Sequence, residues 1–175
     1  MRIKLAIVVL AGLTRAWAAE PPAEEYRVKG AFLLNFARFV EWPAQAFKGP
    51  GDAIEICILG SNPFNPALDQ AAKAVMAESR SVSVRQIADP QQARQCHVVF
   101  VSASERKRTH AVLEAVQGQG VLTVGESEGF IAGGGMIEFR VDENKVRMEI
   151  SDPAAKRAGL HISARLLSLA QAGKR

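Results

Sequence analysis

The sequence predicts a single three-layer α/β domain in which a mixed β-sheet is flanked by helices. Short apolar segments typical of buried strands alternate along the chain with segments of helical periodicity. Near the carboxyl end, two segments of alternating polarity are separated by a turn signal, which indicates a β-hairpin. The length of 175 residues suits one domain with its own core, and neither a repeat nor a linker divides the chain.

The start of the chain has the composition of a secretory signal peptide. Two basic residues precede a run of nine apolar residues at positions 5–13, and Ala16 and Ala18 place small residues where signal peptidase cleaves. Such a run is too short to span a bilayer, which takes about 20 residues. We therefore expect a signal peptide at residues 1–18, followed by an exported domain at residues 20–172.

The charge of the exported part excludes one class of partner. Removal of the signal peptide takes away three basic residues and no acidic one, so the formal net charge falls from +4 to +1. The remaining basic residues are scattered and offer no stripe for a phosphate backbone, so we expect no nucleic-acid binding. No later apolar run is long enough to cross a membrane.

The first half of the exported chain begins with a helix at residues 26–42. Its apolar residues form a wide stripe at helical spacing, and Pro43 marks the end because the residue before a proline avoids the helical region. The stripe serves either as core packing or as a docking face. We expect the next elements in this order: a strand at 54–59, a helix at 66–79, a strand at 81–87, a helical turn from Asp89 and a strand at 97–101.

The second half is expected to contain a helix at residues 104–117 with Ser104 as N-cap, and a strand at residues 121–124. Residues 136–141 and 145–150 then alternate in polarity and form the hairpin. Asp152 and Pro153 are typical of an N-cap and a first helical residue, and the last helix is expected to reach about residue 170. The hairpin face opposite the apolar one carries a polar row: Glu138, Arg140, Arg147 and Glu149.

One motif imitates the nucleophile of a serine hydrolase. A Gly-x-Ser-x-Gly motif surrounds Ser127, and Asp142 or Asp152 and then His161 follow in the order of an α/β-hydrolase. The motif works only where a helix starts directly after the serine, whereas the glycine-rich residues 129–135 favour a loop. A strand-to-loop exit is therefore the preferred interpretation, with an exported hydrolase as a remote alternative.

Other apparent sites are also weak. Ser104 and Lys107 match Ser-x-x-Lys, but the motifs that accompany it in β-lactamases are missing. The glycines at 133–135 precede a strand instead of a helix, so they form no phosphate-binding turn. The histidines lie on different expected elements, without a second ligand at metal-binding spacing: His97, His110 and His161. We expect no metal, no cofactor and no catalytic activity.

The two cysteines lie in or beside expected strands. Cys57 lies inside the strand at 54–59, and Cys96 immediately precedes the strand at 97–101. In an exported chain the simplest interpretation is one disulfide, with two buried free thiols as the alternative. Closing a loop of this size would stabilise the fold by about 4 kcal/mol on the chain-entropy model.

Three segments, in this order and spacing, resemble the YfiR-like family of bacterial periplasmic proteins. They are Lys29-Gly30-Ala31-Phe32-Leu33-Leu34-Asn35-Phe36 with Phe39-Val40-Glu41-Trp42-Pro43, then residues 134–139 with 145–150, then 158–160 with 162–167. The resemblance covers nearly the whole exported chain. It implies a small periplasmic α/β domain that forms a homodimer.

The resemblance also implies a function without catalysis. The best-known member of the family binds the periplasmic part of a membrane-bound diguanylate cyclase and holds it inactive. An outer-membrane lipoprotein or reductive stress relieves the inhibition, and the cyclase then makes cyclic di-GMP and favours biofilm growth. The pair Cys57 and Cys96 looks like a disulfide of that member, whereas its second disulfide has no counterpart, since residues 131–138 lack cysteine.

Two surfaces are candidates for binding. The polar row of Glu138, Arg140, Arg147 and Glu149 is the expected contact with the cyclase, and an ordinary solvated sheet face is the alternative. A rival function is a small-molecule sensor module that acts with another membrane signalling protein. Its pocket would lie near the glycine-rich loop and the last helix, with Arg157 and His161 as ligand-binding residues.

Overall fold

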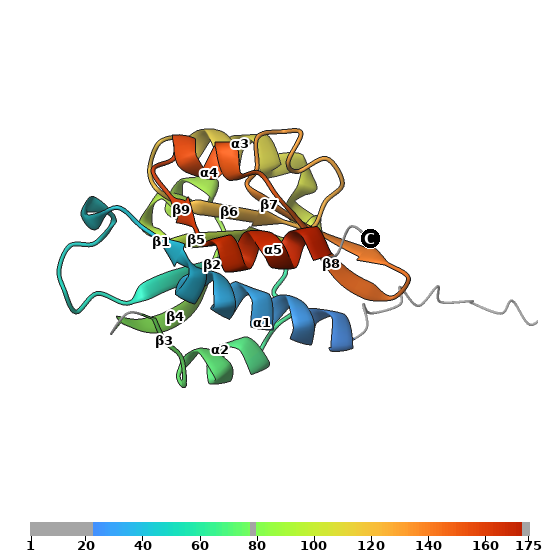
Figure 1. The fold of residues 1–175 in the computed structure, drawn as a ribbon, viewed down its shortest axis with the longest axis horizontal. Coiled ribbons are helices and arrows are strands. Elements are labelled where there is room, and N and C mark those ends of the chain that lie inside the picture. Colours follow the sequence, from blue (N-terminus) through green and yellow to red (C-terminus); the bar gives the residue numbers. More distant parts are fainter. Residues whose placement is uncertain (1–22, 78–79, 173–175) are drawn as a thin grey trace, which may run out of the picture.

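The computed structural model describes residues 23–77 and 80–172. The signal peptide expected at residues 1–18 lies outside the described residues. The described residues form a seven-stranded mixed sheet with helices on both faces, and a small two-stranded sheet beside it (Figure 1). This arrangement confirms the three-layer α/β domain.

The strands have the following bounds: β1 (Val40–Glu41), β2 (Ile54–Leu59), β3 (Met76–Ala77), β4 (Arg80–Ile87), β5 (Val98–Val101), β6 (Leu122–Gly125), β7 (Ile137–Asp142), β8 (Lys145–Ile150) and β9 (His161–Ile162). The large sheet has the order β3-β4-β2-β5-β6-β7-β8, and β1 pairs with β9. The five strands from β4 to β7 in this order are parallel, whereas β3 and β8 are antiparallel to their neighbours.

The α-helices are α1 (Ala23–Phe39), α2 (Ala67–Ala72), α3 (Thr109–Ala115), α4 (Asp152–Arg157) and α5 (Ala164–Ala172). The 3-10 helices are η1 (Ala44–Ala46), η2 (Pro90–Gln95) and η3 (Ala103–Arg108). Figure 1 shows α1, α2 and α5 on one side of the sheet and α3 and α4 on the other. The expected helical turn after Asp89 is η2, and the Asp89 carboxylate accepts a hydrogen bond from the backbone N–H of Gln91.

The central strands divide their side chains between two hydrophobic cores. On β2, Ile56 and Ile58 belong to the core beneath α1 and α2, whereas Cys57 and Leu59 belong to the core beneath α3. All four side chains are fully buried. The division follows from the strand period of two, and it explains why the sequence of β2 is apolar on both faces.

The first core is closed by α1. Leu33 and Phe36 are fully buried, and the Phe36 ring stacks on Phe139 of β7 with 6.0 Å between ring centroids. The apolar stripe of this helix is therefore mainly core packing, and only its margins, such as Phe32 and Phe39, are partly exposed. The helix ends at Phe39, and the chain continues directly into β1.

Several helices are shorter than the sequence predicts. The helix expected at residues 26–42 ends at Phe39, and the first part of the one expected at 104–117 is the 3-10 helix η3. The helix expected at residues 66–79 ends at Ala72, and the chain then forms β3, which pairs with β4. The helix expected from residue 152 to about 170 is broken near Gly159, whose φ of 77° lies in the left-handed region. The residues after this glycine form β9, because pairing with β1 outweighs the local helical pattern.

The hairpin agrees with the prediction, whereas two helix caps do not. The two turn residues between β7 and β8 have φ values of 47° and 60°, as a type I′ turn requires. Ser102 precedes η3 in place of the expected cap Ser104. Ser151 precedes α4, so Asp152 is the first helical residue and not the N-cap.

The connection from β6 to β7 is a coil at residues 126–136, here called the crossover coil. Phe130, which is 2% exposed, packs against both of its ends. A Cβ atom at Gly125 or Gly135 would lie 2.3 or 2.2 Å from the Phe130 ring, so both positions require glycine. The glycine-rich sequence thus serves packing, and no helix follows Ser127, as the sequence predicts.

Candidate functional site

The crevice where ligands usually bind in such sheets is filled by the chain itself. The strand order reverses between β2 and β5, and ligands of α/β sheets favour the carboxyl ends of strands at that point. Gly60 follows β2, and a Cβ atom there would lie 2.4 Å from Glu105 and 2.5 Å from Ser104. Ser104 Oγ accepts a hydrogen bond of 3.0 Å from the backbone N–H of Ser61. Because the chain fills this crevice, the polar groups that are candidates for function are those that lie beside it.

A closed network of charged side chains joins α1 to the carboxyl end of β6. Lys29 Nζ donates to Glu126 Oε2 at 2.7 Å and also to Glu25, and the side chains of Lys29 and Glu126 are each 4% exposed. Glu126 also accepts hydrogen bonds from the Tyr26 hydroxyl at 3.1 Å and from the backbone N–H of Ala103 at 2.9 Å. The network fixes the first half of α1 against the sheet.

Tyr26 is held in its protonated form by this network. Burial raises the pKa of Tyr26, and the negative charge and hydrogen bond of Glu126 raise it further. The Lys29 ammonium lies 4.7 Å from the centroid of the Tyr26 ring. The sequence alone does not identify these residues as a joint site. The available signal was Lys29 itself, because a lysine on the apolar stripe of a helix requires a buried partner.

The expected polar row on the hairpin shares one sheet face, but it is not evenly exposed. Glu138 lies opposite Glu149 in the pairing of β7 with β8, and Arg140 lies opposite Arg147. Glu138 is only 1% exposed, and its carboxylate accepts a hydrogen bond of 3.1 Å from the backbone N–H of Ile131 in the crossover coil. The expectation that Glu138 lies on a solvated face is wrong, because the coil folds back over it.

The exposed part of this face is built around Arg140. Its Nε donates to Glu138 Oε1 at 2.9 Å and its Nη2 to Glu149 Oε2 at 3.2 Å. The hydrogen bond to Glu138 raises the pKa of Arg140. Arg147 Nε is buried without a hydrogen-bond partner. Val141, the next residue of β7, points to the opposite face of the hairpin and is 50% exposed. An oriented guanidinium on one face and an exposed valine on the other suit a protein contact along this edge of the sheet.

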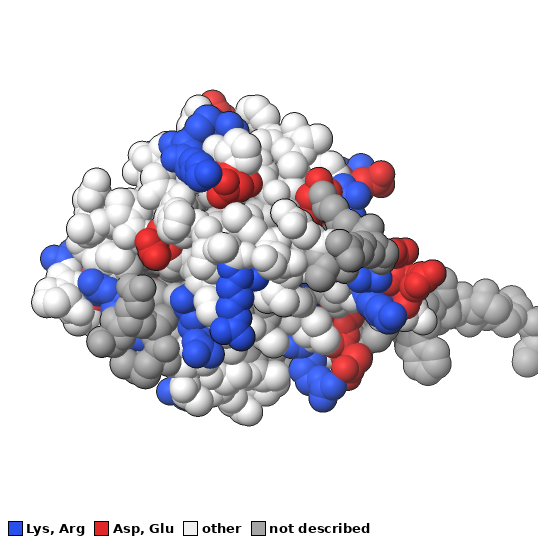
Figure 2. All heavy atoms as spheres, viewed as in Figure 1, with Lys and Arg blue, Asp and Glu red and all other residues white. Residues whose placement is uncertain are grey.

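Charges of both signs are spread over the face that carries α1 and α5. Figure 2 shows several basic side chains on this face separated by uncharged residues, and acidic side chains near others. No continuous basic stripe crosses this face. Within residues 23–77 and 80–172, no helix has both the length and the apolar composition that a bilayer span requires.

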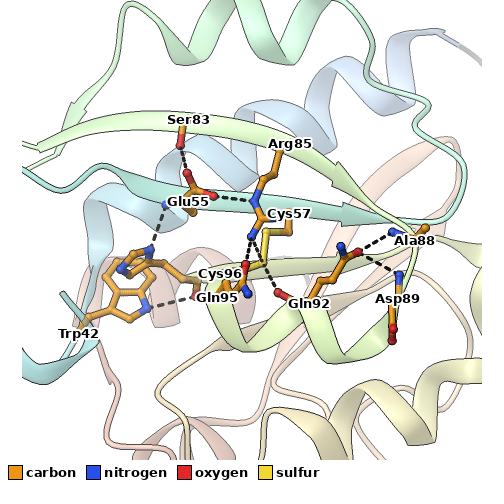
Figure 3. Close-up of a disulfide and its surroundings, with 11 residues drawn as sticks. Trp42, Glu55, Cys57, Ser83, Arg85, Ala88, Asp89, Gln92, Gln95 and Cys96 are labelled. Carbon is orange, nitrogen blue, oxygen red and sulfur yellow. Dashed lines mark hydrogen bonds and ion pairs between the residues drawn. A yellow bond between two sulfur atoms is a disulfide. The ribbon is translucent and has the colours of Figure 1, made fainter. Parts of the chain in front are cut away.

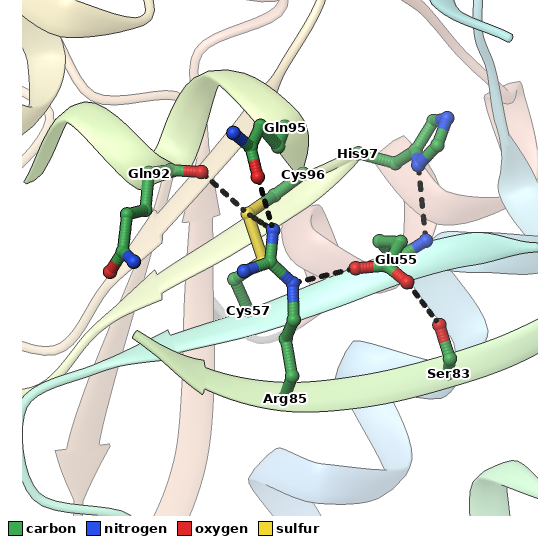
Figure 4. A network of polar contacts seen from close by, with 8 residues as sticks. All are labelled: Glu55, Cys57, Ser83, Arg85, Gln92, Gln95, Cys96 and His97. Carbon is green, nitrogen blue, oxygen red and sulfur yellow. Dashed lines mark hydrogen bonds and ion pairs between the residues drawn. A yellow bond between two sulfur atoms is a disulfide. The ribbon is translucent and has the colours of Figure 1, made fainter. Parts of the chain in front are cut away.

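The expected disulfide is present. Cys57 of β2 and Cys96 at the end of η2 are joined, with 6.0 Å between their Cα atoms (Figure 3). Arg85 of β4 points towards this bond, with Nη2 3.8 Å from Cys96 Sγ (Figure 4). The other edge of the guanidinium donates to Glu55 Oε2 at 2.7 Å, and Glu55 also accepts from the Ser83 hydroxyl. The disulfide thus crosslinks β2 to the start of β5 within the second core.

His97, next to the disulfide, has a structural role. Its Nδ1 accepts a hydrogen bond of 3.0 Å from the backbone N–H of Glu55, so the neutral ring carries its proton on Nε2, which lies 3.2 Å from the Ala46 carbonyl oxygen. The Phe47 ring stacks on the imidazole at 4.6 Å. Burial lowers the pKa of His97, which agrees with a ring that loses a hydrogen bond when it is protonated.

The rival ligand-binding residues lie apart. A hollow of about 700 Å³ lies between α3, α4 and the crossover coil, and Arg157, Gly133 and Gly134 line it. The sequence analysis expected a pocket in this region. His161 lies on β9, opposite Glu41 of β1, and does not line the hollow. Arg157 is therefore placed for a ligand in this hollow, whereas His161 is not.

The hydrolase residues do not form a triad. Ser127 makes no side-chain hydrogen bond with Asp142, Asp152 or His161, and the coil that follows it supplies no helix. Asp152 instead pairs with Lys156 within α4. In the described part of the chain, no three His, Cys, Asp or Glu side chains are grouped so that they could hold a metal ion.

These features define the class of protein. It is a small α/β domain with a closed charged network, a crosslinked core and an oriented polar hairpin at one edge of the sheet. The chain belongs to the YfiR/HmsC-like family, whose model matches residues 26–171. This is a periplasmic regulatory family, and membership suggests regulation of a diguanylate cyclase. No curated protein matches the sequence.

Proposed function

We propose that the protein is a non-enzymatic periplasmic regulator that binds the periplasmic part of an inner-membrane diguanylate cyclase and represses cyclic di-GMP synthesis. The observation that carries this proposal is the family match over residues 26–171. A repressor of this kind stabilises the inactive state of its partner more than the active state. A shift from mostly active to mostly inactive requires a preference of about 5.5 kcal/mol.

The hairpin is the contact surface in this proposal. Arg140, Arg147 and Glu149 would face the cyclase from one side of the hairpin and Val141 from the other, and Glu138 would act from beneath by orienting Arg140. The strand β8 supports this choice, because the described sheet gives it a neighbour on one side only. An edge strand can pair with a strand of a second chain. A homodimer, release by an outer-membrane lipoprotein and an effect on biofilm growth complete the proposal.

The first test is capture of the partner. The mature, disulfide-intact protein is used to pull down proteins from solubilised inner membranes, and cellular cyclic di-GMP is measured with and without the gene. Recovery of a diguanylate cyclase, together with a rise in cyclic di-GMP on deletion, is expected. Absence of both results would reject the repressor function and leave the fold unaffected.

A second test locates the surface. Val141→Asp places a charge at an exposed apolar position of the hairpin, and we expect it to weaken capture of the cyclase without loss of folding. Leu169→Asp on α5 is the matched control, because Leu169 is 48% exposed and also apolar. Equal capture by wild type and Val141→Asp, or equal loss with Leu169→Asp, would reject the hairpin as the contact.

The second candidate function is the sensor module. The hollow of about 700 Å³ lined by Arg157 favours it, because its volume lies in the range of small-molecule sites. A metabolite that survives purification from the periplasm, and that Arg157→Gln releases, would support this function. Binding that depends on His161 and not on Arg157 would contradict the placement in this hollow.

A further inference from the structure

Two residues from the apparent catalytic motifs meet in one pocket. Lys107 of the Ser-x-x-Lys motif and Ser127 of the Gly-x-Ser-x-Gly motif both line a pocket of about 290 Å³. The pocket lies between the η3–α3 segment and the crossover coil, which follow β5 and β6. Both residues lie outside the proposed repressor surface on the hairpin.

Several polar groups of this pocket lack partners among the described residues. Arg106 and Lys107 are exposed and form no ion pair there, unlike His110, which lies 3.9 Å from Glu114, and Arg108, which bonds to Glu105 and to the Ala88 carbonyl oxygen. Thr109 Oγ1 is buried and has no hydrogen-bond partner. A buried hydroxyl without a partner costs free energy unless a ligand or water completes its bonding.

The chemistry of these groups selects a ligand class. A guanidinium, an ammonium and two hydroxyls are donors, and a phosphate monoester offers acceptor oxygens with one to two negative charges. Leu113 and Phe130 supply apolar lining, and the volume exceeds that of a bare phosphate. Glu128 on the lining opposes an anion and reduces the positive charge that the two basic residues provide.

We propose that this pocket binds the phosphate group of a small phosphate monoester. Arg106, Lys107, Thr109 and Ser127 hold the phosphate, and the organic part lies along Leu113. His110, Leu113 and Gly133 also line the larger hollow beside α4, so a longer organic part can extend in that direction. The proposal assigns binding alone to Ser127, because no helix follows it.

The test uses the mature protein and three probes: inorganic phosphate, glycerol 3-phosphate and glycerol. Amide chemical shifts by NMR and calorimetric titration report binding. We expect glycerol 3-phosphate to bind more tightly than inorganic phosphate, glycerol not to bind, and the shifts to cluster at residues 106–113 and 127–133. If inorganic phosphate bound as tightly as glycerol 3-phosphate, the subsite for the organic part would be rejected. If neither probe showed saturable binding, the whole site would be rejected.

Variants assign the binding to named groups. Arg106→Gln/Lys107→Gln should weaken ester binding by about tenfold or more, and Thr109→Val by several-fold, because each removes donors to a charged group. Glu128→Gln should tighten it. The matched control is Arg38→Gln/Arg165→Gln, which removes two other basic residues without ion-pair partners among the described residues. Unchanged affinity in the first variant, or an equal loss in the control, would overturn the proposal.

Discussion

Two polar regions lie at the carboxyl ends of β5 and β6: the closed charged network and the small pocket beside η3 and α3. The consecutive residues Glu126 and Ser127 belong to different regions. Glu126 belongs to the closed network, where it accepts bonds from Lys29, Tyr26 and a backbone N–H. Ser127 lines the pocket in which Thr109 Oγ1 has no partner. The same two loops thus supply a region whose polar groups are satisfied and one whose groups are not.

The difference teaches how to separate structural from binding polarity in this fold. Buried charges with complete partners hold elements together, and removal of one partner is strongly destabilising. Groups without partners contribute little to the fold, and they are available to a ligand. The number of partners therefore distinguishes the two roles better than residue type, because Ser127 stands in a hydrolase-like motif that the sequence already interprets as a strand-to-loop exit.

The largest effect is expected from breaking the closed network. Lys29→Met leaves the buried carboxylate of Glu126 without its cation, and we expect a loss of about 3–5 kcal/mol in the free energy of unfolding. Chemical denaturation measures this loss. Lys107→Met, at an exposed lysine without an ion pair, is the control and should change stability by less than about 0.5 kcal/mol. Similar losses of stability in the two variants would contradict the difference between the closed network and the pocket.

The second effect concerns the disulfide. Cys57→Ala/Cys96→Ala should lower the free energy of unfolding by about 2–4 kcal/mol, since the loop is closed over a sequence separation of 39. Denaturation of the variant and of the wild type without reductant gives the difference. A variant as stable as the wild type would show that the crosslink contributes only to geometry.

Reductant provides a sharper version of this experiment. Cys57 is fully buried, so a thiolate can attack only Cys96, and this attack expels Cys57 as a thiolate inside an apolar core. The reverse reaction would expel Cys96, whose thiolate would lie beside Arg85. It would require attack on the sulfur of Cys57, which is inaccessible. We expect thiol labelling in dithiothreitol to be slow under native conditions and fast in denaturant. Fast native labelling would instead favour redox control.

A smaller effect is expected from pH at His97. Its pKa in the folded state is lowered from the ordinary 6.5, so the unfolded chain binds the proton first as the pH falls. Stability is therefore complete above about pH 6.5 and is lost as the pH falls towards the folded pKa. Melting temperatures at pH 7.5 and 5.5 measure the loss, and His97→Gln should reduce the difference. An unchanged difference would assign the pH dependence to other groups.

The smallest effects come from a matched pair of hydroxyl deletions. Tyr26→Phe removes a donor to Glu126 and should cost about 1 kcal/mol or more, because the acceptor is charged and buried. Thr109→Val removes a buried hydroxyl without a partner and should leave stability unchanged or raise it. Calorimetric melting of both variants tests whether the two regions differ as described. A larger loss for Thr109→Val would reveal a partner for that hydroxyl.

The sequence predicts the elements whose pattern is local. The apolar strands β2 and β5 and the hairpin were expected within a residue or two, because burial on both faces or on one face produces a distinct pattern. The helices that failed were decided by distant contacts. Helical periodicity continued past Ala72 and across Gly159, but pairing of β3 with β4 and of β9 with β1 ended both helices.

The candidate sites were less accessible to sequence reasoning. The pairing of Cys57 with Cys96 followed from residue type and compartment alone. The burial of Glu138 did not, because it depends on the crossover coil, and the coil depends on how Phe130 packs between two glycines. Lys29 and Glu126 are 97 residues apart, and no local pattern links them.

The pairing of β1 with β9 has a consequence for biosynthesis. The first helix runs directly into β1, and β9 lies near the other end of the chain, so part of the surface on which α1 docks consists of residues made last. A chain that emerges amino end first therefore leaves part of the apolar stripe of α1 uncovered until β8, β9 and α5 have followed. Such late closure slows folding and favours aggregation of incomplete chains. A holding chaperone that binds apolar helices would protect this interval.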